Sequence, residues 1–162
     1  MLLPGHYVIE TAVTDEQAEK TSVKRVSVFV DSGKQLGLSS VEVVNRVEPL
    51  NGPHNPMNPF EIESGRVVPT FTDSVASGKP VGLYFIVYPA KLDVAEDTRV
   101  TLQLFHDGKE VARQPVTLPQ PAADGSIPIL LQLSPDPGQC DIKVTAQQGA
   151  LMAQSTLAVK VE

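Results

Sequence analysis

The sequence predicts an all-β protein: an immunoglobulin- or fibronectin-like β-sandwich preceded by an extra N-terminal β-hairpin. Apolar and polar residues alternate over short runs, which is the period of a strand rather than of a helix. The 14 prolines and 11 glycines separate these runs at the spacing typical of a sandwich. The most continuous apolar run, Val81 to Tyr88, is rich in aliphatic and aromatic residues and stops at Pro89, which favours a buried strand.

Length and composition fit one globular core. The chain has 162 residues, of which 41% are hydrophobic and 20% are charged, so one sizeable core is expected and wholesale disorder is not. The formal net charge is −6, and the basic residues are scattered, with Lys24-Arg25 the nearest approach to a cluster. Nucleic-acid binding needs clustered Lys and Arg, so we expect no nucleic-acid partner.

The single cysteine, Cys140, argues against an intramolecular disulfide and against a cysteine-based zinc site. We expect it to be a small buried residue rather than a reactive thiol. No segment approaches the roughly 18 apolar residues of a membrane-spanning helix, so no membrane span is expected. No cofactor is expected either.

The first expected element is a hairpin. His6 to Thr14 and Ser22 to Val30 both alternate as strands do, and Asp31 to Gln35 follows as a linker. An isolated two-stranded hairpin is only marginally stable in water, so its apolar face needs a sheet to join. It could fold back on the sandwich or pair with a second copy, giving a homodimer through the N-terminal hairpin.

The middle of the chain is expected to combine strands with loops. Leu36 to Val47 alternates as one strand, Pro49 to Pro59 is too rich in proline for regular structure, and Thr72 to Lys79 is a polar loop. Two short extended pieces, Phe60 to Ile62 and Arg66 to Phe71, lie between these loops. In this region Glu61 and Glu63 alternate with apolar residues, as exposed positions of a strand do.

The run Val81 to Tyr88 is the expected central strand. Tyr84, Ile86 and Tyr88 would point to one side of the sheet, and Leu83, Phe85 and Val87 to the other. Both sets are bulky, so we expect apolar cover on both faces or a face that meets a partner.

The last third of the chain is expected to be strands joined by tight turns. About eight or nine strands are expected after Leu36, a number typical of a sandwich. Pro128 predicts that its strand lies at a sheet edge, and Asp107-Gly108 predicts a hairpin turn. Lys91 to Thr98 is the one place where a short helical turn is expected. The expected strands are Arg99 to His106, Glu110 to Val116, Ile127 to Leu133, Gln139 to Ala146 and Ala153 to Val161.

The first and last hairpins resemble each other in sequence. Pro4-Gly5-His6-Tyr7 and the strand that follows align with Pro137-Gly138-Gln139-Cys140 and its strand, and Val26-Ser27-Val28 aligns with Val159-Lys160-Val161. We therefore expect residues 1–31 to be the closing hairpin of a preceding immunoglobulin-like repeat, and residues 36–162 to be one whole sandwich domain. Chance similarity between two β-hairpins is the alternative.

Five motifs of the chain form a recognisable set: Pro4-Gly5-His6-Tyr7, Leu36-Gly37-Leu38-Ser39-Ser40, Arg46-Val47-Glu48-Pro49-Leu50, Gly82 to Pro89, and Leu104-Phe105-His106-Asp107-Gly108-Lys109. Together they resemble the C-terminal region of large acidobacterial proteins related to von Willebrand factor A. The resemblance implies an exported, multidomain protein whose C-terminal part is built of β-sandwich modules, in an extracytoplasmic location: periplasmic, secreted or at the cell surface. Where the family's closing hairpin has Tyr, as at Tyr7, this chain has Cys140.

The family's metal-dependent adhesion site uses an Asp-x-Ser-x-Ser loop. Neither Asp31-Ser32-Gly33 nor Asp73-Ser74-Val75-Ala76-Ser77 fits it, so the resemblance implies no metal site. The histidines His6, His54 and His106 have no ligand-like spacing, and surface or turn positions are expected for them. Asp93, Glu96 and Asp97 form an acidic loop without the alternating carboxylates and central glycine of a calcium loop.

These patterns favour a non-catalytic module that spaces domains or recognises a protein partner or neighbouring domains of the same chain. The second hypothesis is a carbohydrate- or calcium-binding β-sandwich module. An enzyme is the third hypothesis, because the sequence has no nucleophile elbow, phosphate-binding glycine loop or Cys–His pattern. The candidate partner-binding loop is the proline-rich segment, because its prolines lower the entropy cost of ordering. Its candidate residues are Asn51, His54, Met57 and Phe60.

Overall fold

The computed structural model describes residues 3–30, 35–55, 58–70, 72, 74–91 and 96–162. Within these ranges every regular element is a β-strand, which confirms the all-β prediction. Because the described part contains no helix, it contains none that is long and apolar enough to cross a membrane. The strands are β1 (Gly5–Asp15), β2 (Lys20–Val30), β3 (Gly37–Leu38), β4 (Glu42–Glu48), β5 (Glu61–Ile62), β6 (Gly65–Pro69), β7 (Ser74–Val75), β8 (Val81–Tyr88), β9 (Thr98–His106), β10 (Lys109–Val116), β11 (Ile127–Leu133), β12 (Gly138–Gln148) and β13 (Leu151–Val161).

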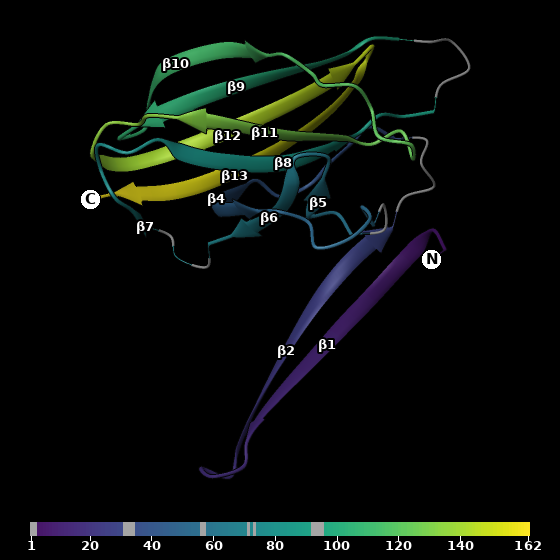
Figure 1. Cartoon of the computed structure of the whole chain (residues 1–162), viewed down its shortest axis with the longest axis vertical. Helices are drawn as coiled ribbons and strands as arrows, with labels where there is room; N and C mark the ends of the chain where they lie inside the picture. The colour runs from purple at the N-terminus through teal and green to yellow at the C-terminus, as the bar shows by residue number, and fades with distance from the viewer. Residues whose placement is uncertain (1–2, 31–34, 56–57, 71, 73, 92–95) are drawn as a thin grey trace.

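The strands form three sheets. One sheet has the order β10-β9-β12-β13-β7, and a second has the order β11-β8-β4-β6-β5 with β3 also paired to β8. All pairs in these sheets are antiparallel except β7 with β13. The third sheet holds only β1 and β2. Figure 1 shows the two larger sheets stacked at one end of the molecule, and we call this part, residues 35–162, the two-sheet body.

The core of the two-sheet body lies between its sheets, an arrangement consistent with a β-sandwich. Alternate residues of β8, with neighbours on β4 and β11, face alternate residues of β9, β12 and β13. The fully buried members include Leu83 and Phe85 from one sheet and Ile142 and Val144 from the other, each with no exposed surface. Burial of this alternating set is what fixes the register of both sheets.

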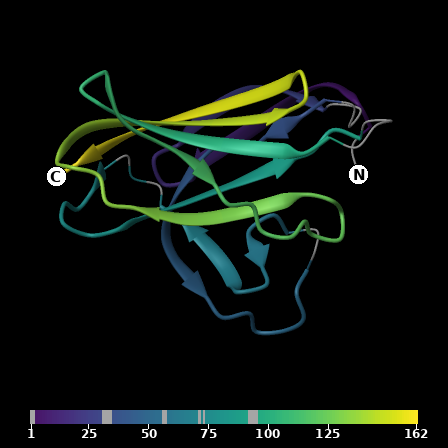
Figure 2. The ribbon, with the colours of Figure 1, turned by 90° about the horizontal axis from the view of Figure 1, so that it is seen from above.

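The opposite face of β8 is covered as well. Tyr84 and Ile86 pack with Val67 of β6, and Val44, Phe60 and Ile62 surround them. In Figure 2, β5, β6 and their connections lie on the far side of the sheet from β12 and β13. The prediction of apolar cover on both faces of this strand is therefore confirmed for Tyr84 and Ile86, whereas Tyr88 at the end of β8 is 44% exposed.

The expected single strand from Leu36 to Val47 is interrupted in the structure. β3 and β4 both pair with β8, but their registers differ by one residue across Ser39–Val41. The Ser39 backbone N–H donates to the Ile86 carbonyl, and the Ser39 hydroxyl accepts the Ile86 N–H, at 2.9 Å each. The side chain thus takes the place of a backbone acceptor, which a residue-by-residue alternation pattern does not reveal.

A strand also occurs where a loop was expected. β7 has only two residues and pairs in parallel with the end of β13. The ladder is extended by two backbone bonds, Glu162 N–H to the Val75 carbonyl and Ser77 N–H to the Glu162 carbonyl. A two-residue strand carries no alternation, so only its distant partner defines it.

Two local predictions are confirmed. The strand with Pro128, β11, lies at the edge of its sheet. Asp107 and Gly108 both have positive φ, 48° and 77°, as the two-residue turn between β9 and β10 requires.

The β1–β2 hairpin lies outside the two-sheet body. It is an 11-residue ladder from Gly5↔Val30 to Asp15↔Lys20, and neither strand pairs with any other described strand. In Figure 1 it extends away from the stacked sheets. Ile9, Val13 and Val26 remain 52%, 66% and 45% exposed, so its side chains lack the cover that β12 and β13 have.

The packing around β8 yields a direct test. Replacing Phe85 by Ala should lower the free energy of unfolding by about 3–5 kcal/mol, because the ring is fully buried and the two sheets cannot collapse into the cavity. Val111→Ala on β10, where the side chain is 57% exposed, should change it by less than about 0.5 kcal/mol. Urea denaturation of both variants measures the difference; comparable losses would contradict the assigned core.

Candidate functional site

The proline-rich loop ends in a turn organised by Glu61. One carboxylate oxygen accepts the Asn55 backbone N–H at 2.8 Å, and the other accepts the Asn58 side-chain amide at 2.9 Å. The Asn58 side-chain oxygen accepts the Phe60 N–H at 3.1 Å, while Asn58 N–H donates to the Asn55 carbonyl at 3.0 Å. The loop is therefore held by its own polar side chains.

The same turn is attached to the body through Tyr84. The Tyr84 hydroxyl donates a hydrogen bond to the Pro59 carbonyl, and the Phe60 ring lies with its centroid 6.0 Å from that of Tyr84. Burial raises the pKa of Tyr84 to about 12, so the hydroxyl keeps its proton at neutral pH. The loop is thus attached to the body by one hydrogen bond, from the Tyr84 hydroxyl, and by one apolar contact, between Phe60 and Tyr84.

The four predicted partner-binding residues of the loop differ in exposure and in contacts. Asn51 is exposed, and His54 is exposed with its Nε2 at 3.0 Å from the Glu61 carbonyl oxygen. Phe60 is half-buried in the cluster around Tyr84, so its ring already serves the protein's own packing. Met57 lies outside the described residues.

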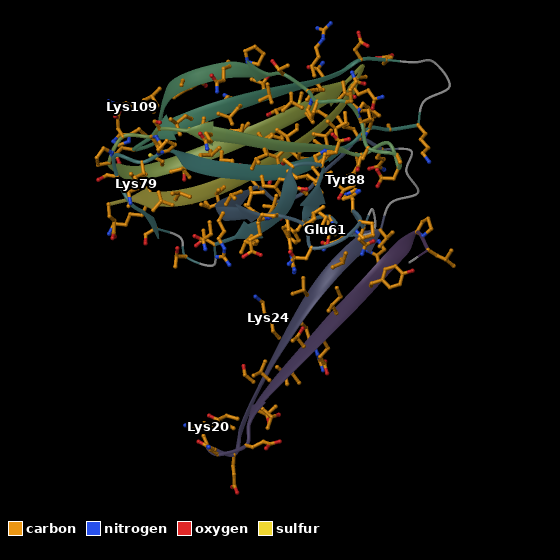
Figure 3. All side chains as sticks on the ribbon, in the orientation of Figure 1. Lys20, Lys24, Glu61, Lys79, Tyr88 and Lys109 are labelled. Atoms are coloured by element: carbon orange, nitrogen blue, oxygen red, sulfur yellow. The ribbon has the colours of Figure 1, made fainter. Side chains whose placement is uncertain are left out.

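Glu61 is the residue of this loop that the sequence pattern missed. It was expected on an exposed strand face, but it sits at the start of β5 with its carboxylate turned to the loop; Figure 3 labels its place in the body. The Asn55 N–H bond, with the Asn58 amide and His54, holds the pKa of Glu61 below its usual value despite partial burial. Two asparagines among prolines, followed at short range by a carboxylate, is the signal that would have indicated a closed turn.

The acidic segment forms an open hollow of about 270 Å³ lined by Glu96, Asp97, Arg99, Gln147 and Gly149. The neighbouring Gln148 side chain accepts the Ala90 N–H at 2.7 Å and donates to the Ala90 and Glu96 carbonyls, which ties the start of this segment to β12. Arg99 brings a positive charge among the carboxylates, which does not suit a cation. The third acidic residue, Asp93, and most of the expected helical turn lie outside the described residues.

Cys140, His106 and Asp107 lie next to one another, a grouping that the sequence did not indicate. The Cys140 sulfur is 3.7 Å from His106 Nδ1, and His106 Nε2 is 3.4 Å from an Asp107 carboxylate oxygen. The thiol also donates to the Asp136 carbonyl at 3.6 Å. Burial and nearby carboxylates raise the pKa of Cys140, which disfavours the thiolate that nucleophilic chemistry needs.

This grouping is a packed corner of the fold. Gly138 has φ of 132°, and a Cβ atom there would lie 2.6 Å from the His106 ring. The ring thus packs directly on backbone, and Cys140 is only 1% exposed. Across the described ranges, no group of three or more His, Cys, Asp or Glu side chains is arranged to hold a metal ion.

The most exposed apolar surface is on the β1–β2 hairpin. Its aliphatic side chains with large exposure are Val8, Ile9, Val13, Val23 and Val26. The expected need of this hairpin for cover was the signal available from the sequence, although none of these residues was singled out as a site. This surface, rather than a cavity, is the strongest candidate for recognition.

No protein-family model matches the chain, and no curated protein matches it. Solved structures that match include an engineered protein determined at 1.98 Å resolution, which is 22% identical, with a TM-score of 0.39. The match covers 55% of this chain and 17% of that one. A likeness of this size carries no argument about fold or function.

The Glu61 turn yields a pH-dependent prediction. A carboxylate whose pKa is lowered on folding adds stability above its unfolded pKa of about 4.5, and that stability is lost as the pH falls through the folded pKa. Glu61→Gln should therefore destabilise the protein at pH 7 and flatten the dependence of its stability on pH below about 4.5. Urea melts between pH 3 and pH 7 measure both effects.

The matched control is Glu63→Gln, an exposed residue of the same β5–β6 turn. It should leave both the midpoint at pH 7 and the acid limb unchanged. If Glu63→Gln and Glu61→Gln behave alike, the carboxylate does not organise the loop.

Proposed function

We propose that this chain is a non-catalytic, immunoglobulin-like structural and interaction module of a larger exported bacterial protein, acting in protein–protein recognition or in spacing domains. The observation that carries the proposal is the pairing of a closed two-sheet body with an uncovered hairpin. A module of this kind connects to other modules through strands and faces rather than through a cleft.

The strand order supports the immunoglobulin-like assignment. Leaving aside the two-residue strands and the short β6, the two-sheet body has seven strands: β4, β8 and β11 share one sheet, and β9, β10, β12 and β13 share the other. This division of seven strands resembles that of fibronectin- and immunoglobulin-type sandwiches. A further point of support is the corner before β12, where the Cys140 thiol bonds back to Asp136 as a corner tyrosine would.

The correspondence of two hairpins supports a modular organisation. β1 and β2 have 11 residues each, as do β12 and β13, and both hairpins begin with a Pro-Gly pair. Tyr7 donates to the Leu3 carbonyl at 2.7 Å, and Cys140 donates to the carbonyl of the residue at the same separation upstream. This match is explained if residues 1–31 are the closing hairpin of a preceding repeat and residues 36–162 are one domain.

The non-catalytic assignment is supported by how the polar side chains are used. Glu61, Gln148 and Cys140 all bond to backbone groups of the chain itself. In the described portion, every buried side-chain nitrogen and oxygen atom has a hydrogen-bond partner. An extracytoplasmic location rests on the family resemblance alone.

The alternative is a carbohydrate- or calcium-binding module. Saturable binding to a glycan panel, or a melting temperature that rises with calcium, would replace the proposal by this alternative. Neither effect is expected, because Arg99 lies among the carboxylates that line the acidic hollow and Phe60 is used in packing.

The first test is removal of residues 1–33. The remaining chain should keep its β-sheet circular dichroism and unfold cooperatively, because the hairpin shares no sheet with the body. Loss of the β-sheet signal would contradict the modular proposal, since the hairpin would then belong to the same folding unit.

A further inference from the structure

The two faces of the β1–β2 hairpin differ in chemistry. Alternation along the ladder places one set of side chains together, and we call it face A: Tyr7, Ile9, Val13, Val26, Val28 and Val30. The other face carries the Glu10–Arg25 ion pair, with Val8, Ala12, Val23 and Ser27 around it. Face A is therefore the more continuous apolar surface.

In the β12–β13 hairpin, the face that corresponds to face A is covered by the opposing sheet. Aligning the Pro-Gly corners puts Tyr7 at the place of Cys140, Ile9 at Ile142 and Val28 at Val159. These three residues of β12 and β13 are at most 1% exposed, because they pack on the sheet that contains β8. Face A thus has the pattern of a surface made to meet an aliphatic sheet.

The edges of the two hairpins also correspond. β12 pairs along nine residues with β9, from Cys140↔His106 to Gln148↔Thr98, and β13 pairs with β7. The outer edges of β1 and β2 have no strand partner in the residues that the structure describes. A covering partner would therefore bring a strand for the β1 edge as well as a sheet for face A.

A second copy of the hairpin would be too small a partner. Two strands of 11 residues span roughly 36 Å by roughly 10 Å, so face-to-face packing of two hairpins would bury about 700 Å² in total. Stable interfaces bury about 1,200 Å² or more. A partner that covers face A and also pairs with the β1 edge buries more than this face alone.

We infer that face A and the free edge of β1 form a docking surface for an immunoglobulin-like β-sandwich that lacks its own two closing strands. This rests on the proposed function, and it specifies the partner: an open aliphatic sheet equivalent to β4–β8–β11, flanked by a strand equivalent to β9. The hairpin supplies the last two strands and closes the core.

Two lysines on the same side of the ladder as face A define its orientation on the partner. Lys20 and Lys24 share this face, at the positions where β13 has Leu151 and Ser155. Figure 3 shows Lys20 at the distal end of the hairpin and Lys24 closer to its middle. Their ammonium groups have to reach water when face A is covered. The aliphatic half near Tyr7 therefore enters the core, and the lysine half lies at its open end.

The test supplies such a partner to the full chain. Residues 35–136, which carry β3 to β11, are fused directly before Pro4 of the chain, so that β1 follows the added β11 as β12 follows it in the body. The backbone amides of β1 and β2 should then exchange hydrogen at least about tenfold more slowly than in the unfused chain. A second fused chain with Tyr7→Cys and Lys24→Ser matches the hairpin more closely to β12 and β13.

Paired substitutions separate the two faces. Ile9→Lys with Val26→Lys should abolish the added protection, whereas Val8→Lys with Val23→Lys, at similar or greater exposure on the other face, should retain it. If neither fused chain protects the hairpin, or if both pairs act alike, the inference is overturned.

Light scattering on the unfused chain tests whether a second copy of the chain covers face A instead. A dimer that Ile9→Lys with Val26→Lys dissociates, and that the opposite-face pair leaves intact, would assign face A to a second copy and overturn the inferred partner. If the fused chains show no added protection but the chain without residues 1–33 folds, the inferred docking partner is wrong and the modular proposal is retained. The two proposals can therefore be contradicted separately.

Discussion

The two-sided burial of β8 is the constraint on which the rest of the body depends. A strand with Leu83, Phe85 and Val87 on one face and Tyr84 and Ile86 on the other cannot leave either face in water without exposing large apolar area. The first face requires the opposing sheet, and the second requires the β5–β6 segment and the folded proline-rich loop. The loop is therefore part of the packing of the sheet, not an addition to it.

This dependence explains why the polar groups of the loop bond internally. Once Phe60 and the Pro59 carbonyl are held at Tyr84, the backbone N–H groups of Asn55 and Phe60 need acceptors close by. The Glu61 carboxylate and the Asn58 side chain supply them.

The strands with clear alternation could be predicted from the sequence, and the features that depend on distant partners could not. Val100, Leu102, Ile142 and Val144 alternate with polar neighbours, so β9 and β12 could be predicted as strands. The break at Ser39 and the strand β7 are set by bonds to Ile86 and to the end of β13, more than forty residues away. Glu61 was misassigned because an outward strand position and a loop acceptor look the same in a local pattern.

The two similar hairpins show most directly what a local pattern determines. β1–β2 and β12–β13 share length, corner and apolar spacing, and each forms a regular antiparallel ladder. Yet Ile142 is fully buried while Ile9, at the matching position, is 52% exposed. Alternation and turn residues suffice for the ladder, but burial comes from whatever packs on the face. The exposed Glu10–Arg25 pair cannot replace that burial, because exposed ion pairs contribute little. This mismatch between apolar pattern and exposure is the basis of the docking surface that we infer for β1–β2.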